Sequence, residues 1–553
     1  MKIITLFFTI LLFSSIISAS EKHTKAVDDI FVKWDKSNVP GASVGVFKNG
    51  KTIYARGYGM ANLEYDIPND ADSVFRIGST SKQFTAASII LLAQQGKLSL
   101  DDSLQSFFPE FPNYSKSITL RHLLNHTSGI RDYLTLADLK GLSDFDFYEN
   151  TDVMQWLVRQ SSLNFVPGEE YLYSNSGYWL LGQIVNQKSG MNMAEYANKE
   201  IFKPLGMQNT HFHNDHRKIV KKRASGYTPV ANETYAISMT TLDMIGDGGV
   251  FTTINDIKKW DDAFYNSTSL NDAFWYEMTR QGVLNNGEVI DYAAGLFVSE
   301  HKGLKIISHG GAFVGFRAEL LRFPEHHFSV AVFANRADAR PSVMALEVAD
   351  IFLKNDYTVV PVSEPKTELP PKALEMKAPF EQLTGDYEEQ DGYQFRVSIQ
   401  DDKLHVVQFW NGTEYDLSLS KDSTNTYQIG EDNKLTFTFT DFKSKKARAI
   451  DLIQNGQLSV WNRMIELDIS DINLVEFVGD YYSKELDVTY KLLLNGEVVT
   501  VQIANASPMS ARVINVNRLT YQRGTINFVR HKNEIVGFQL EAGRVKNLEF
   551  TKQ

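Results

Sequence analysis

The sequence predicts an α+β domain followed by two small all-β units, and three observations lead to this prediction. Helical and strand-like patterns mix over the first two thirds of the chain, five of the fifteen prolines crowd into residues 361–379, and short alternating apolar runs follow them. We therefore divide the 553 residues into a leader at 1–20, an α+β domain at 21–356, a proline-rich linker at 357–378 and β units at 379–468 and 469–553.

Strands are expected at both ends of the α+β domain, with helices between them. Residues 42–48 and 51–59 flank Asn49-Gly50, which predicts a β-hairpin, and 312–323 and 328–334 are strand-like. Helices are predicted over 79–95, after Thr253 and Asp256 (a pair resembling a capping box), and over 341–354. This order favours an α+β domain whose sheet is completed only by its last strands.

The two β units share a sequence signature. Leu-Thr-Gly-Asp-Tyr at 383–387 recurs as Phe-Val-Gly-Asp-Tyr at 477–481, each time at the start of a β-rich stretch. We interpret the units as a duplication and expect two small, lipocalin-like antiparallel barrels.

Composition excludes several kinds of chemistry. The chain has no cysteine, which rules out disulfides, Cys-ligated zinc, iron–sulfur clusters and a thiol nucleophile. It carries 56 Lys+Arg against 67 Asp+Glu, a net charge of −11, and nucleic-acid partners are not expected because phosphate binding needs concentrated positive charge.

The first twenty residues resemble a secretory signal peptide. Lys2 precedes an uncharged run at 3–17, and Ser18-Ala19-Ser20 provides a small-residue cleavage region. We expect a secreted or periplasmic protein with no stable membrane anchor once this segment is removed, since the apolar run is too short to span a bilayer.

The strongest chemical signal is a serine that opens a predicted helix. Ser-x-x-Lys occurs four times in the chain, so the bare motif is weak, but only the copy at Ser79 and Lys82 lies at a helix start. There, positions i and i+3 share a face, so the amine approaches the hydroxyl. Burial would lower the lysine pKa and let the amine accept the serine proton.

Two further clusters support this interpretation. Tyr173 and Asn175 form a Tyr-x-Asn pair in a tyrosine-rich stretch, and Ser-His-Gly-Gly-Ala at 308–312 precedes Val314-Gly315 near the end of the domain. Small residues in a strand let its backbone approach a ligand closely, as an oxyanion hole requires.

With these three motifs in order, the chain resembles the penicillin-recognising serine hydrolases over residues 25–355. Leu-Leu-Asn-His-Thr-Ser-Gly at 123–129 and Pro-Leu-Gly-Met at 204–207 add to the resemblance. It implies a β-lactamase/transpeptidase-like fold, an antiparallel sheet with a helical subdomain. It also implies that Ser79 is the acylated nucleophile, Lys82 its activator and Tyr173 the general base or proton shuttle, with the backbone N–H groups of Ser79 and Ala312 as the oxyanion hole.

The resemblance further implies a substrate-binding role for Asn175, His309, Gly310 and Gly311. β-Lactamases usually carry Lys-Thr-Gly where this chain has His309-Gly310-Gly311, so weak or no β-lactamase activity is expected. An ordinary histidine is mostly neutral at pH 7. We expect hydrolysis of small amides or esters, above all short D-amino-acid-containing peptides as in D-aminopeptidases or D,D-peptidases, without metal or organic cofactor.

Two alternatives stay open. The same site would serve an acyltransferase, or the chain would be a non-catalytic cell-envelope binding protein. Other suggestive residues have simpler interpretations: we expect the histidines at 211–216 to lie in an exposed loop, Asp247, Asp386 and Asp480 to be turn residues, and His126 to be scaffold near the site.

Overall fold

A computed structural model describes residues 21–553 with gaps at 144, 232–233, 267–269, 359–377, 390–393, 409–413, 420–424, 430–434, 455–456, 465–471 and 505. The expected signal peptide and nearly all of the proline-rich linker lie outside the described residues. The chain divides into two compact units. One comprises Met1–Ile130, Asp144–Val158 and Phe165–Val362, and the other Arg131–Ser143, Arg159–Asn164 and Ser363–Gln553.

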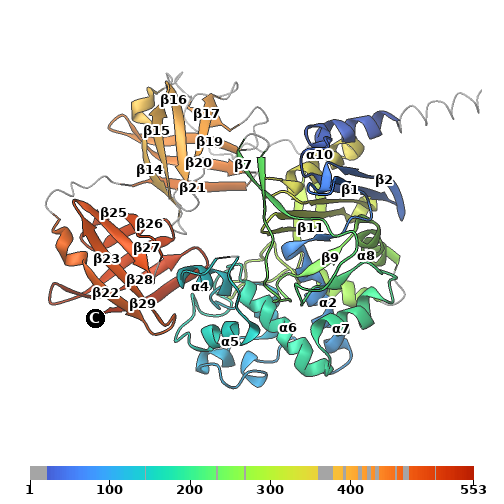
Figure 1. Cartoon of the computed structure of the whole chain (residues 1–553), viewed down its shortest axis with the longest axis horizontal. Coiled ribbons are helices and arrows are strands. Elements are labelled where there is room, and N and C mark those ends of the chain that lie inside the picture. Colours follow the sequence, from blue (N-terminus) through green and yellow to red (C-terminus); the bar gives the residue numbers. More distant parts are fainter. Residues whose placement is uncertain are drawn as a thin grey trace, which may run out of the picture. The chain divides into compact units, whose positions relative to one another are not determined.

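A six-stranded antiparallel sheet forms the centre of the first unit (Figure 1). Its strands, in spatial order, are β10 (Phe297–His301), β11 (Leu304–Phe313), β12 (Phe316–Phe323), β13 (Phe328–Ala334), β1 (Ala42–Lys48) and β2 (Lys51–Tyr58). β1, the first strand of the chain, pairs with β13, the last strand of this sheet along the chain, with Ala42 opposite Ala334, so the sheet is completed only by the end of the domain. This confirms the expected late completion.

The hairpin at the start of the sheet has the predicted turn. Asn49 and Gly50 take φ values of 51° and 72° between β1 and β2. Two consecutive residues with positive φ define the tight connection that suits the twist of paired strands.

Helices cover both faces of the sheet. On one face α10 (Pro341–Leu353) and the helical residues 21–31 bury Val44, Val330 and Val348 in one apolar core. On the other face α8 (Ile254–Asn266) lies so close that a side chain on Gly45 would meet Ile254. The remaining helices of this unit are α2 (Lys82–Gln94), α3 (Leu120–Leu124), α5 (Asn150–Val158), α6 (Asn175–Ser189), α7 (Met193–Ala197) and α9 (Asp272–Thr279).

Two predicted elements need correction. Thr253 Oγ1 accepts from Asp256 N at 3.1 Å, which forms one half of a capping box. The Asp256 side chain does not form the other half, because its carboxylate accepts from Asn209 N and Thr210 Oγ1. The strand-like run predicted at 312–323 is interrupted, because β11 ends at Phe313 and β12 begins at Phe316 after a turn in which Val314 has a φ of 43°.

Smaller sheets complete the first unit. A three-stranded sheet has β9 (Val250–Thr252) between β5 (Phe75–Arg76) and β6 (His211–Phe212). Two-stranded pairs join β3 (Met60–Asn62) to β4 (Ile67–Pro68) and β7 (Tyr227–Ala231) to β8 (Thr234–Ile237).

The second unit contains two closed eight-stranded antiparallel barrels, as predicted (Figure 1). The first barrel comprises β14 (Gly385–Glu388), β15 (Gln394–Gln400), β16 (Lys403–Gln408), β17 (Glu414–Leu419), β18 (Thr426–Gln428), β19 (Leu435–Lys443), β20 (Lys446–Gln454) and β21 (Gln457–Arg463). The second comprises β22 (Gly479–Ser483), β23 (Val488–Asn495), β24 (Val498–Ile503), β25 (Met509–Asn515), β26 (Arg518–Tyr521), β27 (Gly524–His531), β28 (Glu534–Ala542) and β29 (Val545–Lys552).

The recurring five-residue signature makes the same contacts in both barrels. Tyr387 OH donates to Leu383 O at 2.9 Å, and Tyr481 OH donates to Phe477 O at the same distance. The carbonyl of the aspartate accepts from the chain just after the last strand in each copy, at 2.8 Å. Equivalent side-chain and backbone bonds at equivalent positions support the duplication.

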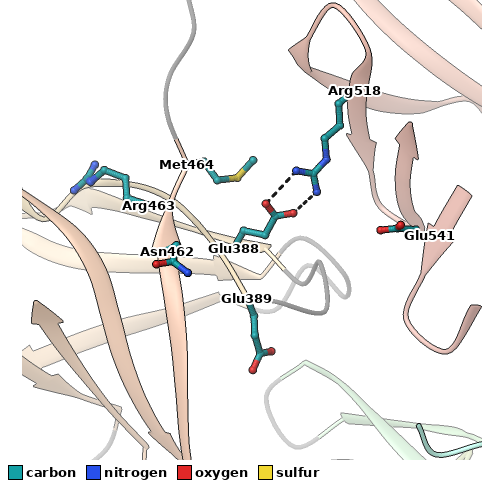
Figure 2. A pocket seen from close by; sticks show the side chains of 7 residues that line it. All are labelled: Glu388, Glu389, Asn462, Arg463, Met464, Arg518 and Glu541. Atoms are coloured by element: carbon teal, nitrogen blue, oxygen red, sulfur yellow. Dashed lines mark hydrogen bonds and ion pairs between the residues drawn. The ribbon is translucent and has the colours of Figure 1, made fainter. Parts of the chain in front are cut away.

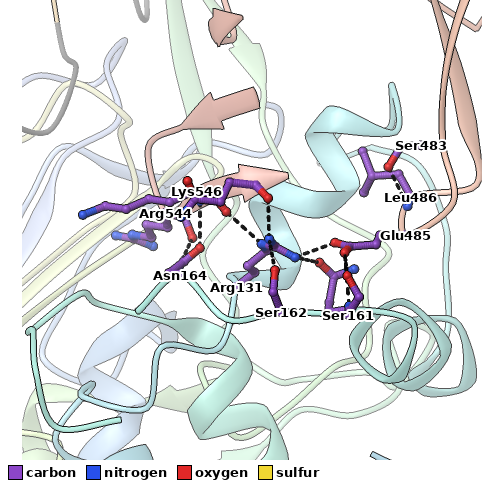
Figure 3. A network of polar contacts seen from close by, with 11 residues as sticks. Arg131, Ser161, Ser162, Asn164, Ser483, Glu485, Leu486, Arg544 and Lys546 are labelled. Atoms are coloured by element: carbon purple, nitrogen blue, oxygen red, sulfur yellow. Dashed lines mark hydrogen bonds and ion pairs between the residues drawn. The ribbon is translucent and has the colours of Figure 1, made fainter. Parts of the chain in front are cut away.

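Two segments of the predicted α+β domain belong to the same unit as the barrels. Arg131, whose side chain is fully buried, pairs with Glu485 and donates to the carbonyls of Lys546 and Asn547 at 3.0 and 2.9 Å (Figure 3). Asn164 binds the same strand through Lys546 N at 2.7 Å. In addition, Tyr490 OH donates at 2.7 Å to the carbonyl oxygen of Leu139, the last residue of α4 (Tyr133–Leu139). The second barrel is therefore held by buried polar contacts to segments 131–143 and 159–164.

A hollow in the second unit is lined by charged residues whose charges are partly paired. Arg518 donates to both carboxylate oxygens of Glu388 (Figure 2). The guanidinium of Arg463 lies over the Tyr387 ring. The residues that line the hollow are Glu388, Glu389, Asn462, Arg463, Met464, Arg518 and Glu541. The hollow holds none of the predicted site residues. Within the described part of the chain, no helix combines the length and apolarity needed to cross a membrane.

Replacing Arg131 by methionine should weaken the second barrel strongly. Glu485 would keep its buried carboxylate without the guanidinium, and breaking a buried ion pair from one side costs about 3–5 kcal/mol. We expect R131M to lower the urea midpoint at which peptides from 479–552 lose protection, measured by hydrogen-exchange mass spectrometry.

Arg159 provides a matched control. Its pair with Asp487 is 3.0 Å long, but both side chains are about half exposed, at 44% and 54%. An exposed pair of this kind contributes about 0–1 kcal/mol. If R131M and R159M lower this urea midpoint equally, the assignment of the buried Arg131–Glu485 pair as the contact that stabilises the second barrel would be contradicted.

Candidate active site

Ser79 lies in a tight turn that is fixed by the backbone around it. The turn, η2 (Gly78–Ser81), follows β5 and leads directly into α2, so the predicted helix over 79–95 begins at Lys82. Gly78 has a φ of 51°, and a Cβ there would lie 2.8 Å from Ala312 N. Only glycine therefore lets this turn approach β11 so closely.

Neighbouring hydroxyls hold the same turn in place. Thr80 Oγ1 donates to His309 O on β11 at 3.0 Å, and Ser81 Oγ accepts from Val250 N on β9 at 3.0 Å. The turn is thus tied to two sheets, which fixes the position of the Ser79 backbone.

Lys82 is fully buried and points its amine at three oxygens. Nζ donates to Asn175 Oδ1 at 2.8 Å and to the Asp247 carbonyl at 2.6 Å, and it lies 3.2 Å from Ser79 Oγ. A neutral amine has two N–H donors for the first two oxygens and a lone pair for the serine hydroxyl, and the three oxygens come from different segments. The amine is therefore held in hydrogen-bonding distance of the hydroxyl, as a proton transfer between them requires.

Tyr173 and Asn175 reach the site from the start of α6. Lys82 Nζ lies 4.8 Å from the centre of the Tyr173 ring and 5.6 Å from that of Tyr178. The ring of His126 lies 4.0 Å from that of Tyr173, and its Nδ1 accepts from Ser174 N at 3.1 Å. His126 thus supports the Tyr173–Asn175 segment by contact and hydrogen bond, in agreement with its predicted scaffold position.

His309 is buried and neutral. Its Nδ1 lies 2.6 Å from Gly310 O, an atom that only accepts, so Nδ1 carries the proton and Nε2 accepts from Tyr292 OH at 2.9 Å. Burial lowers the pKa of His309 to about 3, and the charge of Lys82 acts in the same direction. The imidazole therefore provides no positive charge at pH 7.

The two glycines that follow have opposite environments. A Cβ on Gly311 would lie 1.9 Å from Ile77 O, beside the Ser79 turn. A Cβ on Gly310 would lie 3.1 Å from Glu319 Oε2, on the side of α10. Close approach of backbone on one side and of a carboxylate on the other explains why β11 has no side chains at these positions.

Glu319 is a buried carboxyl directly behind the site strand. It lies opposite Gly310 in the β11–β12 register, and its Oε2 accepts from Ser342 Oγ at the start of α10. Burial raises the pKa of Glu319 from 4.5 to about 7. No motif in the sequence pointed to this residue.

The structure brings together all the predicted site residues of the first unit. It also adds Tyr292, Tyr178 and the Asp247 carbonyl, which no sequence motif marks; Asp247 acts through its backbone, as a turn residue can.

The predicted exposed loop at 211–216 is wrong for its first half. His211 is in β6 and His213 is 2% exposed, because both pack against the Phe251 ring.

Asp215, His216 and Asp243 have ligand atoms within 4.8 Å of one another. Their atoms are already engaged, since His216 Nδ1 lies 2.9 Å from Asp243 Oδ2 and Asp215 accepts from Arg217. We assign no metal to this group.

The fold and this geometry agree with the comparison to known families. The Beta-lactamase family model matches residues 27–351, which is more than half of the chain. The chain therefore belongs to the Beta-lactamase family of serine hydrolases, and it is an enzyme of this class.

Among individual proteins, the chain is 32% identical to penicillin-binding protein 4* of Bacillus subtilis (strain 168) over 407 residues, which are 70% of this chain and 88% of that protein. It is 26% identical to the D-aminopeptidase of Gluconobacter oxydans (strain 621H) over 300 residues, covering 54% of this chain and only 56% of that enzyme. The octameric penicillin-binding protein homologue from Pyrococcus abyssi shares the fold, with a TM-score of 0.55 at 23% identity over 80% of this chain and 99% of that one.

The carboxyl of Glu319 makes stability depend on pH. Below 4.5 the folded and unfolded states both hold its proton, whereas between 4.5 and about 7 the unfolded state releases the proton first and the folded state loses stability. We expect E319Q to remove this loss, a relative gain of at most about 3 kcal/mol above the folded pKa.

The measurement is urea unfolding of wild type and E319Q at pH values below 4.5 and above 7. Glu325→Gln, at an exposed position on the connection after β12, is the control and should change stability equally at both. A difference between wild type and E319Q that is the same at both pH values would contradict the buried, protonated carboxyl.

Proposed function

We propose that this enzyme is an exported serine hydrolase that forms an acyl-serine intermediate on small amides or esters, above all short peptides containing D-amino acids. The observation that carries the proposal is the buried Lys82 amine within 3.2 Å of Ser79 Oγ. A weak hydroxyl nucleophile needs an adjacent proton acceptor, and this geometry provides one.

In the first half-reaction Ser79 Oγ attacks the substrate carbonyl carbon. Its proton passes to Lys82, with Tyr173 as the partner that relays it. The carbonyl oxygen becomes an oxyanion, and the backbone N–H groups of Ser79 and Ala312 stabilise it. The close approach of the Gly78 turn to Ala312 N supports this pairing of donors.

The proton then passes to the leaving amine or alcohol as its bond to the carbonyl carbon breaks. A water molecule attacks the acyl-serine ester and gives its proton to the same Lys82/Tyr173 pair. The second tetrahedral intermediate then collapses to the free acid, and the pair returns the proton to Ser79 Oγ as the ester bond breaks. Asn175 would bind the substrate amide, in keeping with the place of its side chain beside Lys82 Nζ.

Substrate choice follows from the strand at 309–311. The neutral His309 and the absence of a side chain on Gly310 leave this strand without the cation and hydroxyl that receive a β-lactam carboxylate. We therefore favour substrates that do not need a cation and a hydroxyl on this strand to bind a carboxylate. The names of two relatives, a D-aminopeptidase and a penicillin-binding protein, are consistent with D-configured peptides or amides.

Export is part of the proposal and rests on residues 1–20 alone. A basic start, an uncharged apolar run and a small-residue exit favour cleavage by a signal peptidase. The enzyme would then act on peptides or esters outside the cytoplasm.

Ser79→Ala tests the nucleophile. Wild type should react with a fluorophosphonate probe and hydrolyse a D-amino-acid anilide, whereas S79A should lose both by at least about 1,000-fold, because removing a nucleophile removes covalent catalysis. Ser299→Ala is the matched control: Ser299 has the same Ser-x-x-Lys spacing but lies on β10, and its loss should change neither rate.

A substrate panel accompanies this test. D-amino-acid anilides, L-amino-acid anilides, short-chain esters and a chromogenic cephalosporin are compared by kcat/KM. The proposal expects the D-anilides or esters to be preferred over the cephalosporin. Folded wild type that the probe does not label, or a cephalosporin as the best substrate, would overturn it.

A further inference from the structure

A row of side chains crosses the small sheet that supports the nucleophile turn. In the register of β5, β9 and β6, Arg76 pairs with Phe251 and Phe251 pairs with His211. Directly paired residues on neighbouring strands project to the same face. Arg76, Phe251 and His211 therefore form a continuous row across three strands.

Cationic groups surround the phenylalanine in this row. The guanidinium carbons of Arg223 and Arg76 lie 5.1 and 5.9 Å from the centre of the Phe251 ring. The His211 ring stacks on it at 5.7 Å and the His213 ring meets it edge-on at 4.4 Å. Cation–π contact holds the two arginines in place but does not neutralise them.

Arg223, which is half-buried, differs from Arg322 and Arg336 in having no acid beside it among the described residues. Arg322 pairs with Asp261 at 2.8 Å, and Arg336 with Asp338 at 2.7 Å. Among the described residues, no carboxylate lies within ion-pair distance of Arg223, and burial alone acts on its pKa, which it lowers. A partly buried cation without a counter-charge is destabilising, so an anion bound beside it would stabilise the fold.

Two unused polar atoms belong to the same cluster. His213 is 2% exposed and its Nε2 makes no hydrogen bond within the described structure, and the same holds for the buried Nε of Arg223. His213 Nδ1 is used, since it lies 3.2 Å from His211 Nε2. Buried polar groups are normally hydrogen-bonded, and two such orphans beside one cation indicate a missing acceptor.

The electrostatics of the histidines agree with this interpretation. Burial lowers the pKa of His211 to about 4 and that of His213 to about 3, and every charge that acts on them is positive: Arg223 and Lys218 on both, and His211 and Arg76 on His213 as well. When His211 Nε2 donates to His213 Nδ1, the neutral His213 carries its proton on Nε2 and can donate it to an anion.

We propose that Arg223, Arg76 and His213 form a binding site for a small oxyanion, a carboxylate or phosphate group, on the face of the β5–β9–β6 sheet. Arg223 and His211 are half-buried and open the site to solvent, whereas His213 lies at its floor. Guanidinium and imidazole donors are suited to such groups, because charge-assisted hydrogen bonds to oxyanions are short and strong.

The site borders the catalytic residues. Arg76 precedes Ser79 by three positions, and its guanidinium lies 4.8 Å from the ring of Phe313, the residue after Ala312. The oxyanion is therefore either a carboxylate carried by the substrate or a free anion such as phosphate. The substrate source rests on the proposed function, whereas binding of free phosphate does not.

Phosphate binding is measured by isothermal titration calorimetry at low ionic strength with inorganic phosphate. Wild type should bind one phosphate saturably, and Arg223→Gln should weaken binding at least about tenfold, as expected for the loss of a charge-assisted contact. Arg223→Lys should restore part of it. Arg217→Gln is the control, since Arg217 is an exposed arginine paired with Asp215, and it should bind as wild type does.

Folding of each variant is checked by circular dichroism and urea unfolding, and His213→Gln provides a second variant with the same expected loss. To separate the two sources, kcat/KM is compared for anilides with and without a free carboxylate. A loss in R223Q confined to the carboxylated anilide assigns the site to the substrate; weaker phosphate binding with both anilides unaffected assigns it to a free anion.

The proposal is overturned if wild type shows no saturable phosphate binding and R223Q hydrolyses both anilides at the wild-type rate. It is also overturned if R217Q loses as much phosphate affinity as R223Q. Failure of the hydrolysis assay in wild type, with phosphate binding intact, would count against the proposed function and not against this site.

Discussion

Lys82 holds its amine in a fully buried position among Ser79 Oγ, Asn175 Oδ1 and the Asp247 carbonyl, and the surrounding structure serves to keep it there. Each acceptor comes from a separate part of the first unit: the turn before α2, the start of α6, and the loop before β9. Burying an amine is costly unless its donors are satisfied. The fold therefore has to bring these three segments to one point.

Close backbone contact between the Ser79 turn and β11 positions the site more than side-chain packing does. Gly78 and Gly311 remove the side chains that would separate the Ser79 turn from β11, and Thr80 joins the two by a hydrogen bond to His309 O. Such contact leaves main-chain N–H groups close to the nucleophile, where charge develops during acyl transfer. The neutral His309, which accepts a hydrogen bond from Tyr292 OH, fills space beside the site without adding positive charge.

Much of this architecture could be predicted from local patterns. The Asn49-Gly50 hairpin, α2, α10 and both barrels follow from turn residues and periodicity, and Ser79, Lys82, Tyr173 and Asn175 follow from motifs in order. What depends on tertiary contact could not be predicted. Glu319 and Tyr292 carry no motif, the burial of His213 requires Phe251 from a distant strand, and nothing local reveals that Arg131 is held by a barrel residue.

The rate at which Lys82→Met reacts with a fluorophosphonate probe tests the central contact most directly, because methionine fills similar space without an amine. A proton acceptor beside a nucleophile contributes about 10²–10⁴-fold to rate. We expect K82M to keep the wild-type fold, verified by urea unfolding, and to react at least about 100-fold more slowly. Labelling of K82M at the wild-type rate would contradict the assignment of Lys82 as the group that activates Ser79.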